Sequence, residues 1–341
     1  MTELAEVVAI DDPSGVAEAR RHAVRLARLI KFNKTAAGIL AIAITEVAGN
    51  IVKHARSGKI AMRAIEMAGL AGLEVLAFDK GPGIANIAEC MRDGHSTAGS
   101  PGTGLGALQR LTSHFELYTR RGIGTIARFE AWPGDAPRRV PSVNQLEPGG
   151  ISEPMPGEVV CGDDWVMTSW RDRHAVFVVD GLGHGPDAAF AARTAVAVAV
   201  ECAQSSAPDI MDAVHDALRP TRGAAAAVAI IEPGKELCTF CGVGNISAGI
   251  RLGGVSRSMI SHNGTLGHKV KTIQAFSYPF PRTAVLIAHS DGLNSSWNLG
   301  DYPGLELRHP ALIAAALARD HTRGRDDLTV VAVRNLKSPG A

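Results

Sequence analysis

The sequence predicts an α+β protein built of two domains, and three observations lead to that prediction. The chain has 341 residues, which is enough for two domains that each bury a core. Segment 135–149 is rich in Pro and Gly and has no hydrophobic periodicity, as is typical of a linker. On each side of it, short apolar runs typical of strands alternate with longer runs of helical period. We therefore expect domains at 1–134 and 150–335.

The composition is that of an ordinary soluble protein. Hydrophobic residues make up 46%, charged residues 20%, and the net charge is +1. This balance indicates neither nucleic acid nor a membrane as a partner. The N-terminus carries acids where a secretion signal needs basic and then apolar residues, and no uncharged apolar run approaches the length of a membrane span. We expect a cytoplasmic protein.

The cysteines predict no special chemistry. Their odd number, five, in a chain of this size suits a reducing compartment. Cys238 and Cys241 read CxxC, but they lie in a run typical of a strand, where residues i and i+3 face opposite sides of a sheet. We expect neither a zinc site nor a redox pair there.

In the first domain, apolar patterning and helix-start residues predict alternating elements. Asp12, Pro13 and Ser14 form a typical helix start. We expect strands at 4–11, 58–67, 73–79, 115–121 and 124–132, helices at about 15–31, 35–56 and 84–93, and another helix after the turn GSPGTGLG. Arg21, Arg25 and Arg28 share one face of the first helix. A solvated basic face is the simpler interpretation, and a docking surface for an acidic partner is the alternative.

The second domain is expected to be dominated by strands, with Ala-rich helices between them. The expected helices lie at about 186–204, 208–218 and 310–319, and the clearest strands at 224–232, 237–244, 247–252, 284–290 and 328–333.

Four acids and one glycine of the second domain stand where strands meet turns. Asp180 and Gly181 end the run AVFVVDG, Asp163 lies in CGDD, Asp291 follows AVLIAHS, and Asp326 precedes LTVVAV. Hard divalent cations take oxygen ligands of this kind. Converging carboxylates would raise one another's pKa without metal, whereas two cations would balance their charges. The set indicates two-metal hydrolysis of a phosphate ester.

Three residues beside these acids are left out of the set. Asp164 and Asp327 adjoin predicted ligands, and adjacent side chains on a strand point opposite ways, so we expect only one of each pair inside. His184 in GLGHGP is either a general acid or a histidine that shapes the turn, and we do not count it as catalytic.

The first domain carries three short boxes in order. Glu46 and Asn50 are four residues apart on a predicted helix and so point the same way. Asp79, Gly81 and Gly83 follow a strand as DxGxG. A glycine turn that can offer N–H groups to phosphate comes last, as Gly102, Thr103, Gly104, Leu105 and Gly106. Neither a Walker A sequence nor the HRD motif of protein kinases is present.

Together these boxes resemble the N, G1 and G2 boxes of the GHKL ATPases over residues 1–134. The fit is closest to the small serine kinases of the RsbT and SpoIIAB kind, which act as anti-sigma or stressosome switches. The resemblance implies a Bergerat α/β sandwich, ATP and Mg²⁺ as cofactors, Glu46 as catalytic base and Asn50 as magnesium ligand. It places Asp79 and the glycines of both turns, with Thr103 and Leu105, around ATP. The short segment between Gly83 and Gly102 implies a short ATP lid.

The second domain resembles the SpoIIE and RsbX branch of the metal-dependent (PPM, protein phosphatase 2C-like) phosphatases. The motifs that carry the resemblance are PGEVVCGDDW, VVDGLGHG, GVGNISAGI, AHSDGL and GRDDLTVVAV, in that order. The resemblance implies an αββα sandwich with two Mn²⁺ or Mg²⁺ ions. It implies Asp180 as the bridging ligand, completed by the Gly181 carbonyl, Asp163, Asp291 and Asp326.

The two resemblances imply a bifunctional signalling switch. One domain would use ATP to phosphorylate serine or threonine of a STAS-domain regulator of the anti-anti-sigma or stressosome type, and the other would remove the phosphate. A sigma factor or downstream regulator is a further possible partner. In the alternative, the first domain only binds ATP or a partner and transfers no phosphate.

The division into domains predicts that a cut at about residue 140 yields two fragments that fold separately. Each should show its own cooperative unfolding transition in circular dichroism during a urea titration. A fragment that stays unfolded would show that the division is wrong.

Overall fold

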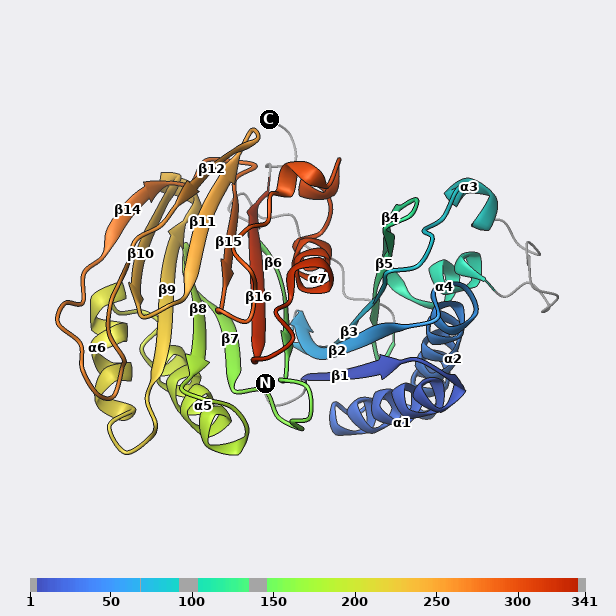
Figure 1. Cartoon of the computed structure of the whole chain (residues 1–341), viewed down its shortest axis with the longest axis horizontal. Coiled ribbons are helices and arrows are strands. Elements are labelled where there is room, and N and C mark those ends of the chain that lie inside the picture. The colour runs from blue at the N-terminus through green and yellow to red at the C-terminus, as the bar shows by residue number, and fades with distance from the viewer. Residues whose placement is uncertain (1–4, 68, 92–103, 135–145, 337–341) are drawn as a thin grey trace. The chain divides into compact units, whose positions relative to one another are not determined.

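The computed structural model describes residues 5–67, 69–91, 104–134 and 146–336. Contacts divide the chain into two compact units, Met1–Val140 and Pro141–Ala341, and each is described by itself. Both units mix helices with antiparallel strands, which confirms the predicted α+β class (Figure 1).

The first unit is one five-stranded antiparallel sheet with helices packed on one face. The strands are β1 (Ala5–Ile10), β2 (Gly58–Met67), β3 (Leu70–Asp79), β4 (Ser113–Arg120) and β5 (Gly124–Ala131), in the order β1-β2-β3-β5-β4. The helices are α1 (Pro13–Leu29), α2 (Lys34–Asn50), α3 (Ile87–Cys90) and α4 (Leu105–Leu111). Figure 1 shows α1 and α2 side by side on the sheet.

Capping residues fix where the two long helices begin. Asp12 accepts hydrogen bonds from the N–H groups of Ser14 and Gly15, and Pro13 occupies the first turn. Asn33 caps α2 through the N–H of Ala36 at 2.8 Å. These starts agree with the expected positions within two residues, because both rest on local chemistry that the sequence displays.

The end of α2 differs from the continuous helix that was expected. After Asn50 the chain widens into a π-helical turn, η1 (Ile51–Ala55), and Arg56 then takes a left-handed conformation with φ of 70°. Such wide turns are rare and often lie at functional sites. The turn starts directly after the predicted magnesium ligand.

Helices α1, α2 and α4 bury their apolar faces against the sheet. The core that results includes Leu26, Leu40, Ile44, Leu73 and Phe129, each almost fully buried. Packing of this buried face fixes α2 against the sheet. It therefore also positions the side chains on the opposite face of α2.

The second unit contains two sheets. The first holds β7 (Asp163–Trp170), β8 (Arg173–Gly181), β9 (Ala224–Glu232), β10 (Leu237–Val243), β13 (Ser261–His262) and β14 (Phe276–Pro279). The second holds β6 (Leu146–Glu153), β11 (Ser247–Leu252), β12 (Val255–Ser258), β15 (Val285–His289) and β16 (Leu328–Asn335), in the order β12-β11-β15-β16-β6. The helices are α5 (Pro186–Glu201), α6 (Ala207–Ala217) and α7 (Pro310–His321).

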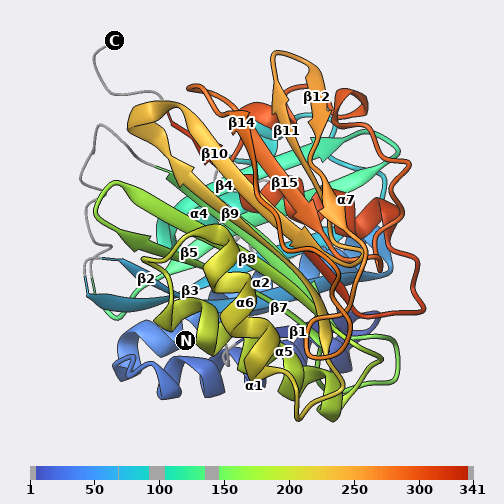
Figure 2. The same ribbon diagram turned by 90° about the vertical axis from the view of Figure 1, so that its left-hand side faces the viewer.

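These elements form four layers. Residues such as Trp165, Phe240 and Val331 fill the space between the sheets, and Phe177, Met211 and other residues lie between the first sheet and the α5–α6 pair. Helix α7 packs on β6 and β16 of the second sheet. Figure 2 shows α5 and α6 lying across the strands of the first sheet. This is the αββα sandwich that was expected.

The start of the second unit corrects the expected linker. Residues 146–149, assigned to the linker because of Pro148 and Gly149, belong to strand β6. In the sheet order this strand lies at the edge beyond β16, where proline is tolerated. Gly149 is needed for packing, because a Cβ there would overlap the backbone nitrogen of Ala311 in α7. The turn-forming composition of this segment concealed a strand in which Gly149 allows close contact between helix and sheet.

One helical segment of the described residues, Lys34–Ala55, is long and apolar enough to cross a membrane, with a mean hydropathy of 1.7. A core helix of a soluble protein meets the same criterion. Glu46 interrupts its apolar run, and Leu40, Ile44 and Val47 pack into the core of the first unit. This packing accounts for part of its hydropathy, since 39% of the apolar window is buried.

Substitution Gly149→Val should destabilise the second unit by about 3 kcal/mol, because the side chain meets backbone that cannot turn aside. Urea denaturation followed by tryptophan fluorescence measures the loss. Gly134→Val is the matched control, since a Cβ there meets nothing within 4 Å. Equal stability of the two variants would contradict the proposed close contact between β6 and α7.

Candidate functional site

The centre of the second unit's site is a pair of aspartates on neighbouring strands. Asp163 begins β7 and lies directly opposite Asp180 near the end of β8. Side chains of directly paired residues lie on one face of the sheet, about 5 Å apart at Cβ. The ladder itself brings the two acids together.

Burial makes this pair costly to ionise. Burial raises the pKa of Asp180 to about 7, with the charges of Asp291, Asp326 and Asp327 adding to the effect. Burial also raises the pKa of Asp163 well above its usual range, and the charge of Asp180 comes next among the causes. Without a cation, protons balance the charge here. A divalent cation would displace them.

The other two predicted acids lie at the same end of the sandwich. Asp291 follows β15, and Asn245 donates a hydrogen bond to its Oδ2 at 2.8 Å. Asp326 precedes β16 and accepts the N–H of Asp327 at 3.0 Å. Both charges act on Asp180. In the described part of the chain no three acidic, His or Cys side chains already converge as a formed metal site.

Asp327 joins the acidic cluster, although only one of the two adjacent acids was expected to face it. It is 2% exposed, and its Oδ1 accepts the N–H of Met155 at 2.8 Å. Its charge acts on both Asp163 and Asp180. Strand alternation does not separate Asp326 from Asp327 because β16 starts only at Leu328.

Asp164 behaves as expected for the neighbour that faces away. Its Oδ1 accepts the N–H of Trp165 at 2.7 Å, and burial raises its pKa to about 7. The charges of the clustered acids do not contribute to the pKa shift of Asp164. They do raise the pKa of Asp163.

The residues present fit divalent cations. Asp163 Oδ2 and Asp327 Oδ2 are buried and have no hydrogen-bond partner among the described residues. Unsatisfied carboxylate oxygens of this kind are what Mg²⁺ and Mn²⁺ ligate. Gly181 must be glycine, since a Cβ would overlap the carbonyl oxygen of Ala188, and its N–H donates to Gly162 at 3.0 Å. These contacts fix the peptide that carries the Gly181 carbonyl.

A pair that sequence reasoning missed joins the two loops beside the cluster. His184 Nδ1 lies 2.7 Å from Glu158 Oε1. Burial raises the pKa of Asp327, and nearby His184 offsets a small part of that rise. Gly185 has a φ of 76°, and a Cβ there would approach Glu158 at 3.1 Å. The sequence shows Glu158 in the motif PGEVV. It does not show that Glu158 pairs with His184, which lies 26 residues later in the chain.

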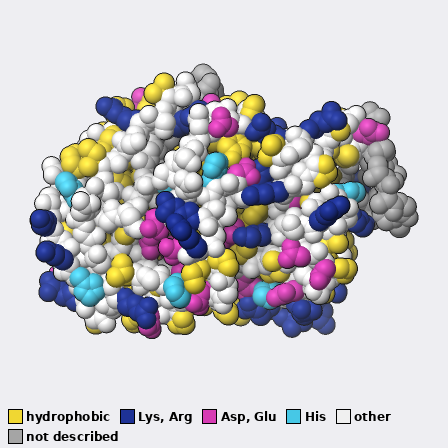
Figure 3. Space-filling model, viewed as in Figure 1, with side chains coloured by type: hydrophobic (Ala, Val, Ile, Leu, Met, Phe, Trp, Pro, Cys, Tyr) yellow, Lys and Arg dark blue, Asp and Glu magenta, His cyan; other side chains and the backbone are white. Residues whose placement is uncertain are grey.

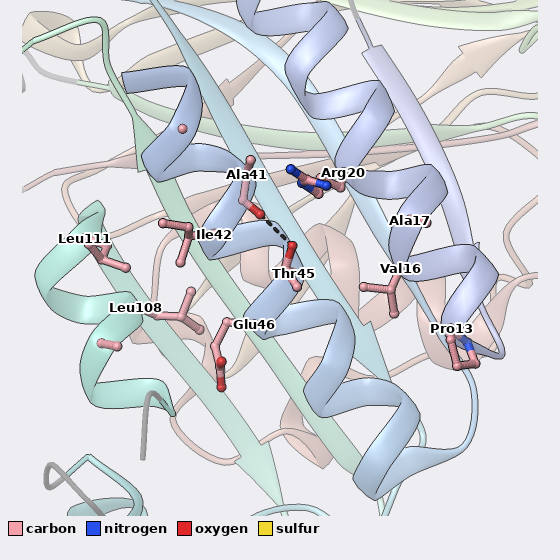
Figure 4. Close-up of a pocket in the computed structure, with 12 residues that line it drawn as sticks. Pro13, Val16, Ala17, Arg20, Ala41, Ile42, Thr45, Glu46, Leu108 and Leu111 are labelled. Carbon is pink, nitrogen blue, oxygen red and sulfur yellow. Dashed lines mark hydrogen bonds between the residues drawn. The ribbon is translucent and has the colours of Figure 1, made fainter. Parts of the chain in front are cut away.

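In the first unit, Glu46 and Asn50 lie on successive turns of α2, and Asn50 is its last residue. Asp79 ends β3, and its Oδ1 accepts the N–H groups of Gly81 at 2.7 Å and Thr125 at 3.3 Å. These bonds fix the carboxylate at the strand end, where an adenine amino group could be recognised. Figure 4 shows Glu46 beside Leu108 of α4.

The glycines of the DxGxG box are required by close packing. A Cβ on Gly81 would lie 2.6 Å from Cβ of Ala55 in η1, and one on Gly83 would overlap the carbonyl of Arg120. Gly83 also has a φ of 68°. The box therefore packs directly on the π-helical turn that follows Asn50.

The last box is described only in part. Gly104 precedes α4 as its N-cap residue, and Leu105 and Gly106 start the helix. Gly102 and Thr103 lie outside the described residues.

Cys238 and Cys241 lie on opposite faces of β10, as expected from their spacing. They belong to different core clusters, and burial raises their pKa values to about 12 and about 11. Thiols in such settings are poor nucleophiles and poor metal ligands.

Comparison with known proteins finds a different family for each unit. Residues 10–130 match the model of the histidine kinase-like ATPase domain, and residues 171–335 match that of stage II sporulation protein E (SpoIIE). The serine/threonine-protein kinase RsbT of Bacillus subtilis is 34% identical over 117 residues, which are 34% of this chain and 88% of that protein.

Two further matches are a phosphatase and a solved structure. The phosphoserine phosphatase RsbX of Bacillus subtilis is 26% identical over 139 residues, 40% of this chain and 70% of that protein. A solved structure of the bacterial stressosome, described as a modular system that has been adapted to control secondary messenger signalling, aligns with a TM-score of 0.53 at 27% identity. It covers 56% of this chain and all of its own.

The raised carboxyl pKa values predict how pH affects the metal-free protein. Since the folded Asp180 has a pKa of about 7 against an ordinary 3.8, the folded state holds a proton that the unfolded chain has released. Its contribution to stability is complete below about pH 4 and is lost as pH rises through 7. In EDTA, the melting temperature of Asp180→Asn should therefore fall less between pH 5 and pH 8 than that of the unchanged protein, by on the order of 5 °C.

Calorimetry at both pH values measures the difference, and Mn²⁺ should remove it for the unchanged protein. Identical pH dependence of the two proteins would contradict the buried, protonated pair.

Proposed function

The chain belongs to two families, with a histidine kinase-like ATPase domain followed by a SpoIIE phosphatase domain, and on this premise we propose that it is a bifunctional phosphorylation switch. It is a serine/threonine phosphatase that carries a kinase-like ATPase domain. The substrate of both activities is proposed to be a STAS-domain regulator of the anti-anti-sigma or stressosome type.

The acidic cluster is the observation that supports the phosphatase half most directly. Asp163 and Asp180 are held in register by β7 and β8, and Asp291 and Asp326 approach from the second sheet. Two Mn²⁺ or Mg²⁺ ions bound there would supply a water of lowered pKa and would neutralise charge on the phosphate. Asp180 would hold both ions, and the Gly181 carbonyl, Asp163, Asp291 and Asp326 would complete the ligand set.

The chain's other residues support this site by orienting its ligands. Asn245 holds Asp291 through its side-chain amide, and Met155 holds Asp327 through its backbone N–H. Such outer partners fix the orientation of carboxylates around a metal. Asp327 is the added candidate, since its buried Oδ2 has no hydrogen-bond partner among the described residues.

In the ATPase domain, Glu46 is proposed to accept the proton of the attacking serine hydroxyl. The hydroxyl oxygen would form a bond to the γ-phosphorus of ATP, the bond from that phosphorus to the bridging oxygen would break, and ADP would leave. Asn50 would hold Mg²⁺, Asp79 would recognise adenine, and Gly81, Gly83 and the turn from Gly102 to Gly106 would surround the nucleotide.

Similarity to a kinase and to a phosphoserine phosphatase within one chain supports opposed reactions on one partner. Two active sites on one polypeptide are always present at equal concentration. The ratio of kinase to phosphatase activity then sets the phosphorylated fraction of the shared substrate. A sigma factor or downstream regulator would then respond to the partner's state. We propose that this switch operates in the cytoplasm.

The test uses Asp180→Asn, which should lose phosphatase turnover by at least about a hundredfold. Incubated with Mg-ATP and each STAS-domain protein encoded in the same genome, the variant should add one phosphoryl group to its partner, as read by intact mass. Adding the unchanged protein with Mn²⁺ should remove that group.

Glu46→Ala in the Asp180→Asn background is the control, and it should abolish the transfer. If ATP binds but no partner gains phosphate, the kinase proposal fails, and the ATPase domain is a nucleotide-sensing binding module. If the unchanged protein cannot dephosphorylate a phosphorylated partner, the phosphatase proposal fails.

A further inference from the structure

Two arginines and an asparagine line an open pocket of about 440 Å³ in the second unit. These residues are Asn294, Arg323 and Arg325, and all three are exposed. Neither arginine of the pocket forms an ion pair with any residue that the structure describes, whereas Arg251 of the same unit is paired with Glu306. Positive charges gathered in this way are available to an anion from outside the chain.

The pocket is built from two loops that backbone hydrogen bonds hold together. The N–H of Arg323 donates to the carbonyl of Gly292 at 2.9 Å. The N–H of Asn294 donates to the carbonyl of His321 at 2.9 Å. The same two loops also form an antiparallel bridge between these bonds. The backbone therefore fixes the place of the pocket independently of its exposed side chains.

The same two loops carry two of the proposed metal ligands. Asp291 precedes Asn294 in one loop, and Asp326 directly follows Arg325 in the other. Consecutive Cα atoms are only about 3.8 Å apart, so the pocket adjoins the acidic cluster. Figure 3 shows Lys and Arg side chains directly beside Asp and Glu side chains on the second unit. A phosphate bound at the cluster would have a positively charged pocket as its neighbour.

The pocket offers hydrogen-bond donors. Oδ1 of Asn294 accepts the N–H of Ser296 at 3.1 Å, which leaves the amide nitrogen of Asn294 to donate to a ligand. A guanidinium group has N–H donors and no acceptor. The pocket therefore suits an anion with oxygen acceptors, and the planar fork of arginine matches a carboxylate in particular.

We propose that Asn294, Arg323 and Arg325 bind the carboxylate of an acidic side chain that lies close to the phosphoserine of the substrate protein. The phosphatase would then select phosphorylation sites with an acidic residue nearby. The inference rests on the proposed phosphatase function. Two bound cations would already neutralise the phosphate that is cleaved, so the arginines are available to a second anion. An extended peptide spans about 3.4 Å per residue, so that anion would lie within about three residues of the phosphoserine.

The experiment measures peptide binding apart from turnover. The probes are phosphoserine peptides in which a phosphonate that cannot be hydrolysed replaces the phosphate, with Glu or Gln placed within about three residues of it. In Mn²⁺, fluorescence anisotropy with the full chain should find a position at which Glu binds about tenfold more tightly than Gln. Arg323→Gln and Arg325→Gln should each reduce this preference to about threefold or less. Arg323→Glu should favour a peptide with Lys at that position.

Arg282→Gln is the matched control. Arg282 is exposed and precedes β15, whereas Asp291 follows that strand, so the two lie at opposite ends of it. This variant should keep the full preference for Glu.

The outcomes separate this proposal from the phosphatase proposal. A preference for Glu that the arginine variants lose supports the pocket even when no phosphopeptide is hydrolysed, because hydrolysis in Mn²⁺ is assayed separately. If Glu and Gln peptides bind equally at every position, or if neither binds, the pocket proposal is overturned. It is also overturned if the arginine variants weaken both peptides equally, since the arginines would then hold the phosphate itself. Loss of the preference in Arg282→Gln would likewise contradict it.

Discussion

The burial of Asp163 against Asp180 is the constraint on which the phosphatase unit depends. A β-ladder pairs the two residues, so their separation is set by backbone hydrogen bonds that many other residues share. In so buried a place the carboxyl groups can ionise together only with compensating positive charge. The surrounding features follow from this requirement: glycines that let chains approach, amides that orient carboxylates, and further acids at the same end of the sandwich.

The ATPase unit meets a different constraint, because one helix serves both the core and the site. The inner face of α2 packs on the sheet through residues such as Leu40 and Ile44, and its outer row carries Glu46 and Asn50. Packing of the inner face thus positions the outer row. The π-helical turn after Asn50 then lets Ala55 meet Gly81 closely, which couples the end of α2 to the DxGxG box.

Local chemistry explains why most elements were predictable. The caps at Asp12 and Asn33, the apolar run of β9 and the Ala-rich pattern of α5 are all visible within a few residues. The misassignment of residues 146–149 has the opposite origin. Pro148 and Gly149 have turn propensity, but their role is decided by α7, which lies more than 150 residues later in the chain.

By itself the sequence determined the order of the motifs, the class of each domain and the residue types that can hold cations or nucleotide, because these depend on composition and short-range spacing. Only the tertiary structure decided which side chains meet. It placed Asp327 with the acids, joined Glu158 to His184 across two loops, and brought Asn294 to the arginine pair of a separate loop. Contacts between residues far apart in the chain depend on how whole elements pack, and no short window of sequence contains that information.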